Sequence, residues 1–132
     1  MIGIDTNVLL RFLLADDAEQ FEAAKHFISE RSVDDPAYIS LVVVAEMAWV
    51  LKRSYRFSNA DIVDVLRKLV PAEQFLFEDE DILDAMIEDE TLRQSDLSDR
   101  IVAHLALRQG ASRVVTFDRK AARDVSHMEL LA

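Results

Sequence analysis

Four acidic residues that lie far apart in the sequence could together bind a metal ion. They are Asp5, Glu46, Asp99 and Asp118, and each lies in or beside an apolar segment. Carboxylates held within a few ångströms of one another repel, so some of them would be protonated at neutral pH unless a cation lay between them. Oxygen-only ligands suit Mg²⁺ or Mn²⁺. The sequence therefore predicts a metal site built from these acids.

Each aspartate also has a purely structural interpretation. Asp5, Asp99 and Asp118 stand at expected helix starts, where a carboxylate accepts hydrogen bonds from free backbone N–H groups. Asp96 lies three residues before Asp99, and one of this pair is expected to cap its helix. Thr116 lies on the same side of its strand as Asp118, so its hydroxyl could support whatever Asp118 binds.

Glu46 is the acid that capping does not explain. Its helical neighbours are apolar, Val42, Val43, Trp49 and Val50 among them, and we expect its side chain to be buried. Burying a bare carboxylate costs several kcal/mol unless it is paired, protonated or bound to a metal. An arginine or backbone donors could satisfy it instead of a metal.

Strands alternate with helices along the chain, which predicts an α/β fold with a parallel sheet covered by helices on both sides. Ligands of such sheets bind beyond the carboxyl ends of the strands, where Asp5 and Asp118 fall. We expect strands over 2–4, 37–40, 73–77 and 113–117, with a possible edge strand at 128–131. After a first helix directly following Asp5, we expect helices over 18–31, 41–55, 58–69, 79–92, 100–109 and 119–124.

Composition favours one globular domain. The 132 residues are 51% hydrophobic, and the chain has two glycines, two prolines and no cysteine. Disulfides, thiol nucleophiles and cysteine zinc sites are therefore excluded. No apolar run reaches membrane-spanning length and no signal peptide is evident, so we expect a cytoplasmic protein.

The net charge of −10 argues against a nucleic-acid partner, but its distribution weakens that objection. Eight acids and no base lie between Glu78 and Glu90, and the rest of the chain carries only −2. We expect this acidic helix to be a solvated surface. His104 is expected to be an ordinary helix residue rather than a ligand.

The motifs resemble those of the PIN-domain nucleases, and the small size is most similar to the VapC-type toxins of toxin–antitoxin pairs. The resemblance covers most of the chain and rests on four segments in order: Ile4-Asp5-Thr6-Asn7, Glu46 with Trp49-Val50-Leu51, Asp99-Arg100-Ile101-Val102-Ala103, and Thr116-Phe117-Asp118. It implies a three-layer α/β/α sandwich with a short, mainly parallel central sheet, as a single PIN-like nuclease domain over 1–132. His104 departs from the small residue more usual in this family.

The resemblance also implies roles for individual residues. Asp5, Glu46, Asp99 and Asp118 would be the catalytic, metal-binding acids, Asp96 an auxiliary acid, and Thr6, Asn7 and Thr116 the residues that orient them. One or two Mg²⁺ or Mn²⁺ ions would activate a water for in-line attack on an RNA phosphodiester. The expected partners are RNA, a cognate VapB-like antitoxin and a second copy in a homodimer. The possible RNA contacts are Lys52, Arg53, Arg56, Arg119 and Lys120, although these bases could equally be plain surface residues.

Two other classes of protein remain compatible with the sequence. A receiver-type signalling domain is also a small α/β fold that binds Mg²⁺, but it needs an acidic pair after the first strand and gives Glu46 no role. A catalytically inert module with the PIN fold would serve only for association, which the complete set of four acids argues against.

Overall fold

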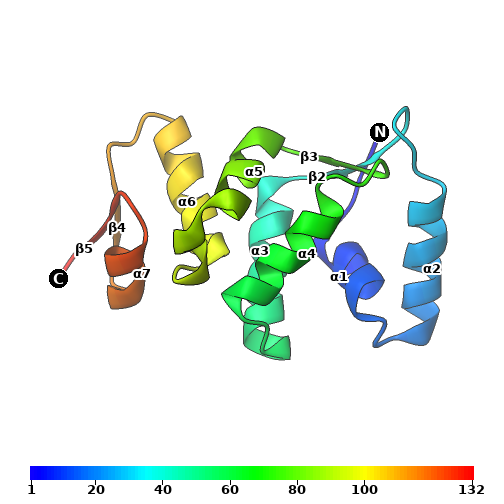
Figure 1. The fold of residues 1–132 in the computed structure, drawn as a ribbon, viewed down its shortest axis with the longest axis horizontal. Coiled ribbons are helices and arrows are strands. Elements are labelled where there is room, and N and C mark those ends of the chain that lie inside the picture. The colour runs from blue at the N-terminus through cyan, green and yellow to red at the C-terminus, as the bar shows by residue number, and fades with distance from the viewer.

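The computed structural model describes the backbone of residues 1–132, and the side chains of all of them except Leu92 and Arg93. Strands alternate with helices as the sequence predicts (Figure 1). The strands are β1 (Ile2–Gly3), β2 (Ala37–Ile39), β3 (Phe75–Phe77), β4 (Val114–Thr116) and β5 (Met128–Leu130). The helices are α1 (Thr6–Leu14), α2 (Ala18–Ser29), α3 (Leu41–Tyr55), α4 (Asn59–Leu69), α5 (Glu80–Glu88), α6 (Leu97–Arg108) and α7 (Arg119–Asp124), with a 3₁₀ helix η1 (Glu90–Arg93) before α6.

The predicted α/β class with parallel strands is confirmed, and the strands form two separate sheets. One sheet has the order β1-β2-β3 and the other pairs β4 with β5, and all neighbouring strands run parallel. The pairing of β1 with β2 places Ile2 beside Ala37 and Gly3 beside Tyr38. The pairing of β4 with β5 places Val114 beside Met128. Each sheet is therefore short, with β1 and β3 as the edge strands of the first sheet and β4 and β5 as those of the second.

Most of the apolar core lies in the part of the molecule that runs from β1 to α5, which we call the N-terminal body. Its fully buried side chains include Leu9 of α1, Ile39 of β2, Met47 of α3 and Leu66 of α4. Local signals delimit these helices. Ser40 accepts a hydrogen bond from the backbone N–H of Val43 at the start of α3, and Ser58 forms a capping box with Asp61 at the start of α4.

The second sheet belongs to a smaller C-terminal unit, made of β4, α7 and β5. Its buried residues Ala121, Val125 and Met128 pack against Ala103 of α6. Leu97 and Ile101 of the same helix are buried in the core of the N-terminal body. Because residues 101 and 103 lie on opposite sides of an α-helix, α6 packs against the N-terminal body with one face and against the C-terminal unit with the other.

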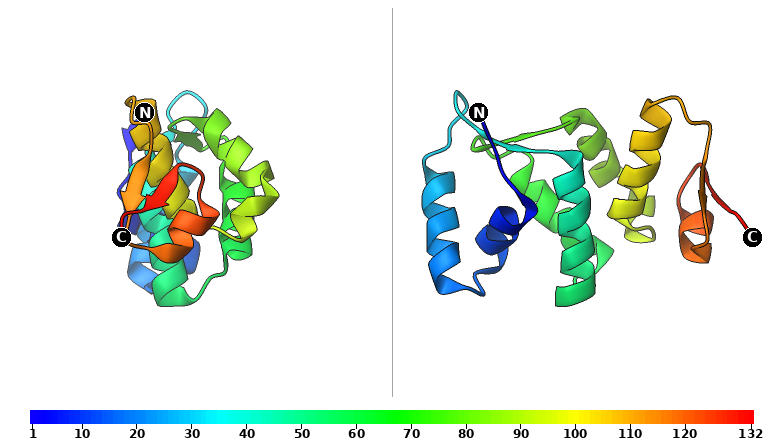
Figure 2. Two further views of the ribbon diagram at one scale, coloured as in Figure 1. Left: turned by 90° about the vertical axis from the view of Figure 1, so that its left-hand side faces the viewer. Right: turned by 180° about the vertical axis from the view of Figure 1, so that it is seen from behind.

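The molecule is elongated as a result. Along its long axis, α6 stands between α3 and the C-terminal unit (Figures 1 and 2). The two sheets, which the sequence interpretation placed in one central layer, lie on opposite sides of this helix. Over the described residues, none of the helices is both long and apolar enough to cross a membrane.

The acidic block differs in part from the solvated surface expected of it. Helix α5 ends at Glu88 rather than near residue 92, and its outer acids are exposed. The ends of the block instead bind α6. Asp89 accepts a hydrogen bond of 2.7 Å from Arg100, and Arg108 is ion-paired with Asp79 and, at 3.3 Å, with Glu78. These pairs fix α6 against the N-terminal body, which sequence periodicity alone could not indicate.

Candidate functional site

Asp5 stands at the junction of β1 and α1 and combines exposure with a capping role. Its Oδ1 accepts a hydrogen bond of 2.7 Å from the backbone N–H of Thr6, and its side chain is exposed. Thr6 is buried, and its hydroxyl has no hydrogen-bond partner within the described part of the chain. A buried hydroxyl without a partner costs roughly 1–3 kcal/mol. The start of α1 therefore contains a buried hydroxyl that no described side chain or backbone group satisfies.

Glu46 is exposed, so the prediction that its side chain is buried is wrong. Its helix α3 buries one side in the core and turns the other side outward. Glu46 shares that outer side with Val42, which is 56% exposed, and Trp49, which is 53% exposed. Sequence periodicity could not separate the two sides because both are apolar. The guanidinium of Arg53, one turn further on, lies 5.2 Å from the Trp49 ring.

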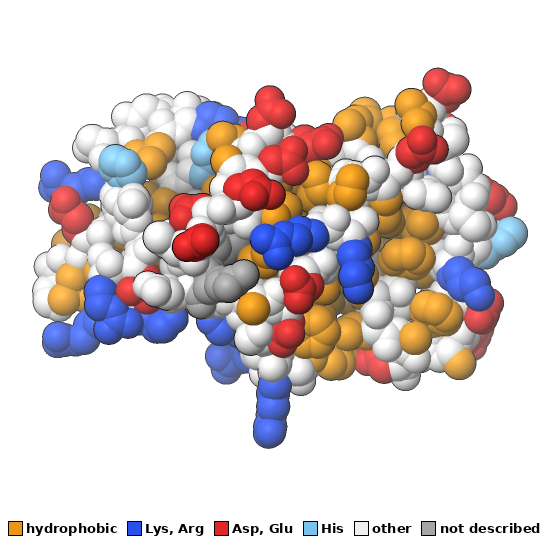
Figure 3. Space-filling view, viewed as in Figure 1, with side chains coloured by type: hydrophobic (Ala, Val, Ile, Leu, Met, Phe, Trp, Pro, Cys, Tyr) orange, Lys and Arg blue, Asp and Glu red, His pale blue; other side chains and the backbone are white. Residues whose placement is uncertain are grey.

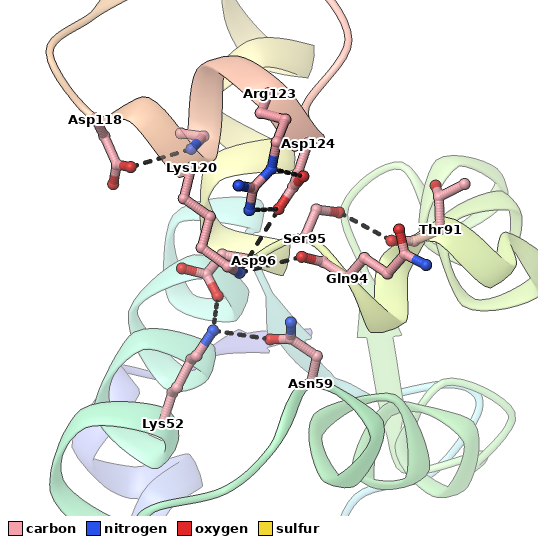
Figure 4. Close-up of polar contacts among 11 residues, drawn as sticks. Lys52, Asn59, Thr91, Gln94, Ser95, Asp96, Asp118, Lys120, Arg123 and Asp124 are labelled. Atoms are coloured by element: carbon pink, nitrogen blue, oxygen red, sulfur yellow. Dashed lines mark hydrogen bonds and ion pairs between the residues drawn. The ribbon is translucent and has the colours of Figure 1, made fainter.

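The start of α6 brings two of the predicted acids together. The helix begins at Leu97, three residues earlier than expected, which puts Asp96 at the N-cap position and Asp99 in the first turn. Asp96 makes no capping hydrogen bond and is ion-paired with Lys52 of α3, whose ammonium also donates to Asn59 at 3.1 Å. Figure 4 shows Lys52 pointing from α3 toward this carboxylate.

Asp118 follows β4 as predicted and caps α7. Its Oδ1 accepts a hydrogen bond of 3.0 Å from the backbone N–H of Ala121, and its own N–H donates to the Thr116 hydroxyl at 3.0 Å. Thr116 thus supports the backbone at Asp118. The ammonium of Lys120 extends back toward α6, where it donates to the Gln94 carbonyl at 3.1 Å (Figure 4).

Asp99 lies half-buried between these groups. Burial raises the pKa of its carboxyl above the ordinary value, and the nearby negative charges of Asp96 and Asp118 raise it further, while Lys52 and Lys120 act in the opposite direction. The two lysines lower the electrostatic cost of the three acids without removing it. A small hollow lined by Asp96, Asp99, Asp118 and Lys120 marks the place.

The structure therefore divides the predicted acids into two places. Asp96, Asp99 and Asp118 gather between α6 and the C-terminal unit, whereas Asp5 stands at the start of α1 and Glu46 on the exposed side of α3. Among the described side chains, no three His, Asp or Glu residues are arranged so that they could hold a metal ion. The donors are chemically right for Mg²⁺ or Mn²⁺, but their arrangement within one chain does not fit such an ion.

Two of the basic residues predicted to contact RNA lie beside these acids. Lys52 and Lys120 flank the acidic group, and Arg53, Arg56 and Arg119 are exposed. In Figure 3, lysine and arginine side chains gather over the end of the molecule that contains α7. The acidic net charge therefore coexists with a basic surface beside the candidate site.

Sequence reasoning missed the residues that hold the two lysines. Asn59 accepts a hydrogen bond from Lys52, and Asp124 lies 3.7 Å from the ammonium of Lys120. The pairing of Lys120 with Asp124 at a spacing of four residues could have been found from the helix pattern. The long-range contact between Lys52 and Asp96 left no local signal.

His104 behaves as an ordinary helix residue, as expected. Its Nε2 lies 3.4 Å from the Asp79 carboxylate, on the side of α6 that Arg108 also occupies. It therefore belongs to the contacts that fix α6 and not to the acidic group.

Comparison with known proteins agrees with the predicted family. A VapC ribonuclease from Aquifex aeolicus (strain VF5) is 27% identical over 118 residues, which span 89% of this chain and 87% of that protein. No solved structure matches the chain. The sequence profile of the PIN domain matches residues 2–126, and the chain therefore belongs to the PIN domain family.

Proposed function

We propose that this protein is an endoribonuclease that hydrolyses RNA phosphodiester bonds and acts as the toxin of a type II toxin–antitoxin pair, inhibiting translation and growth. Its family and its similarity to a VapC ribonuclease support this class of activity. The observation that carries the proposal is the half-buried Asp99 between Asp96 and Asp118, with Lys52 and Lys120 beside them. Membership of the PIN domain family removes the receiver-type alternative.

The charges of this group suit a phosphodiester substrate. Lys52, Lys120 and the exposed arginines offer positive charge to the RNA backbone without reading its sequence. Asp99 has a raised pKa, so its ionised form accepts a proton more readily than an ordinary aspartate. In this proposal Asp99 accepts a proton from the attacking water, whose oxygen bonds to phosphorus as the P–O bond to the leaving oxygen breaks, while the lysines bind the phosphate.

We further propose Mg²⁺ or Mn²⁺ as the cofactor, with Asp5, Glu46, Asp99 and Asp118 as ligands and Asp96, Thr6, Asn7 and Thr116 in supporting positions. When bound, such an ion lowers the pKa of a coordinated water and neutralises developing charge on the phosphate. The single chain does not gather these ligands. The role given above to the lysines does not depend on the ion.

The proposed partners are RNA, a VapB-like antitoxin that blocks the site, and a second copy of the chain. The exposed apolar side chains of α3, Val42 and Trp49, are available for a protein partner. We place the protein in the cytoplasm, where RNA and an antitoxin are both present.

The decisive experiment is an RNA cleavage assay with Mg²⁺ or Mn²⁺, repeated with EDTA. We expect Asp99→Asn to reduce cleavage by about 100-fold or more because it removes the central carboxylate of the acidic group. We expect Glu46→Gln to have a similar effect because it removes a proposed metal ligand. Glu88→Gln, an exposed acid on α5, is the matched control and should cleave normally. Cleavage that persists in EDTA and in both site variants would refute the proposal.

One observation favours a second function. Because no three acids in the described side chains form a metal group, the chain could be an inert binding module with the PIN fold. That function predicts a tight complex with a protein partner and no RNA cleavage at any metal concentration. The same assay therefore separates the two.

A further inference from the structure

The free edge of β1 carries unused backbone hydrogen-bonding groups. The N–H of Ile2 donates to the Pro36 carbonyl at 3.0 Å and the N–H of Ile4 donates to the Tyr38 carbonyl at 3.1 Å. Successive residues of a strand direct these groups to opposite sides. The N–H and carbonyl of Gly3 therefore point away from β2, along an edge that β1 leaves open.

The free edge of β4 is its counterpart. The N–H of Val114 donates to the His127 carbonyl, and the Thr116 carbonyl accepts from Leu131, both at 2.8 Å. By the same alternation, the backbone groups of Val115 and Phe117 point away from β5. Both strands belong to parallel sheets, and unpaired edges of this kind pair readily with another strand.

Apolar side chains are exposed along both edges. Phe117 is 72% exposed, Val115 is 50% exposed and Ile2 is 42% exposed. Beside β1, an open groove of about 430 Å³ is lined by Gly3 and Ile4 together with side chains of α1 and α2, among them Val8 and Phe27. Exposed aromatic and branched side chains next to an apolar groove are typical of surfaces that bind another protein segment.

The two edges cannot meet within one chain as the molecule is folded. Helix α6 stands between them, with Leu97 and Ile101 in one core and Ala103 in the other. Figure 1 shows the C-terminal unit on the far side of α6 from β1. As the molecule is folded, pairing of the β1 edge with a β4 strand therefore requires a second copy of the chain.

We propose that two copies of this chain form a reciprocal dimer in which β4 of each copy pairs in parallel with β1 of the other. The resulting sheet has the order β3-β2-β1 followed by β4 and β5 of the partner. Each dimer contains two such sheets, related by a twofold axis, so that no β1 or β4 edge stays open.

The register follows from the backbone groups and the acids. In a parallel pair, a residue whose N–H and carbonyl both face the neighbour bonds to the two residues that flank its partner position. Gly3 can therefore bond to Val115 and Phe117 of the partner, which sets Gly3 beside the partner's Thr116. Two residues further on, Asp5 then lies beside the partner's Asp118, and Phe117 of the partner lies beside Ile4 and the groove.

This pairing would make each site a product of two chains. Asp5 from one copy and Asp118 from the other would lie at the end of the same completed sheet. That arrangement unites acids that stand at the starts of α1 and α7, on opposite sides of α6, in a single chain. The composite site rests on the proposed nuclease function, whereas the strand pairing does not.

Disulfide cross-linking tests the pairing without reference to activity. The chain has no cysteine, so Ile2→Cys and Val115→Cys can be made in separate copies of different mass and mixed under oxidising conditions. We expect a covalent heterodimer, because neighbouring strands bring these positions within disulfide range. Val33→Cys, at a comparably exposed position away from the edge, replaces Ile2→Cys as the matched control and should cross-link far less.

The double variant Ile2→Cys with Val115→Cys separates the possible pairings. A covalent dimer supports the proposal. A monomer with an internal disulfide would show that the chain closes on itself, and a lack of any disulfide would show that the edges do not pair. Either of these results overturns the proposal. Native mass spectrometry of the unmodified protein should also give a dimer, and a monomer throughout the micromolar range would contradict it.

Complementation tests the composite site. Asp5→Asn and Asp118→Asn are expected to be inactive alone, but the mixed dimer contains one site with both substitutions and one site with neither. An equimolar mixture that has exchanged subunits should therefore recover roughly a quarter of the wild-type activity, by random pairing. No recovery from an active wild type would overturn the composite site. An inactive wild type would refute the proposed function, and the cross-linking result would still decide the pairing.

Discussion

The N-terminal body and the C-terminal unit are built on the same parallel strand and helix pattern, but they differ greatly in how much they bury. The N-terminal body encloses a continuous core that extends from Ile4, just after β1, to Ile101 of α6. The C-terminal unit buries three side chains of its own against Ala103. Local stability follows the buried apolar area. The unit that carries Asp118 is therefore held by few contacts, although it supplies a predicted site residue.

This difference suggests a division of roles. The large core fixes α3 and α6, and with them Glu46, Lys52 and Asp99. The small unit presents β4 and Asp118 on a surface that is open to a second chain. Weak local packing is a cost for a monomer, but docking of the unit on a partner would bury the exposed Val115 and Phe117 and offset that cost.

The largest expected effect comes from matched core truncations in the two regions. Leu66→Ala removes a fully buried side chain from the N-terminal body and should lower the free energy of unfolding by about 2–5 kcal/mol. Met128→Ala removes a side chain of similar size from the C-terminal unit. It should leave the main unfolding transition in urea nearly unchanged, because the unit contributes little to the large core.

Hydrogen exchange distinguishes local from global loosening in these two variants. In Met128→Ala, amide exchange should accelerate over β4, α7 and β5 and stay slow in α3 and α4. In Leu66→Ala, protection should fall throughout the N-terminal body. If Met128→Ala lowered the main transition as much as Leu66→Ala does, the two regions would form one cooperative unit and the comparison would fail.

A smaller effect is expected at the contact that fixes α6 to the N-terminal body. Arg100 donates to Asp89 at 2.7 Å, and Thr91 donates to the same carboxylate. These bonds lower the pKa of Asp89 to about 2. Because the pair is partly exposed, Asp89→Asn should cost only about 1 kcal/mol at pH 7. Glu88→Gln, which changes an exposed neighbouring acid, should hardly change the free energy of unfolding.

The pH dependence of the Asp89 effect has a defined sign. The folded-state pKa is lower than the ordinary value of 3.8, so the stabilisation is fully present above that value and is lost as the pH falls toward 2. Urea unfolding of wild type and Asp89→Asn should therefore differ more at pH 7 than at pH 3. A difference that stayed constant over this range would mean that charge is not its source.

The local elements could be predicted from the sequence, but the arrangement of the sheets could not. Turn residues, caps and periodicity located the strands and helices, and α7 was placed at its observed bounds, Arg119–Asp124. Strand pairing depends on contacts between distant segments. No local pattern says whether β4 lies beside β1 or on the far side of α6, so one central layer was expected where the structure has two sheets.

The candidate site was predictable to the same extent. Asp5 and Asp118 follow strands, as the alternating pattern indicated, and Asp96 and Asp99 share the start of α6. The prediction that Glu46 is buried was wrong because α3 is apolar on both its core side and its outer side. Hydrophobicity alone then cannot indicate which side of the helix faces the solvent. The ion pair of Lys52 with Asp96 depends on how α3 packs against α6, which only the folded chain defines.

The smallest expected effect concerns Asp99, on the helix that separates the two regions. Burial and the charges of Asp96 and Asp118 raise its pKa, so its ionised form destabilises the folded state. In metal-free buffer at pH 7, Asp99→Asn should therefore raise the free energy of unfolding by about 0.5–1 kcal/mol, as replacement of a strained functional residue commonly does. Asp96→Asn, which breaks the ion pair with Lys52, should give no such gain.

The sign of this effect is opposite to that at Asp89. A raised folded-state pKa means that the folded chain holds the proton more tightly, so stability is lost as the pH rises from the ordinary aspartate range through the folded-state value. The gain in the free energy of unfolding from Asp99→Asn should appear at pH values above the ordinary aspartate range. It should vanish near pH 3, where Asp99 itself is neutral. If Asp99→Asn changed the free energy of unfolding equally at pH 3 and pH 7, the cause would be packing and not charge. Opposite pH dependences at Asp89 and Asp99 would separate an acid that holds α6 in place from an acid whose strained charge belongs to the site.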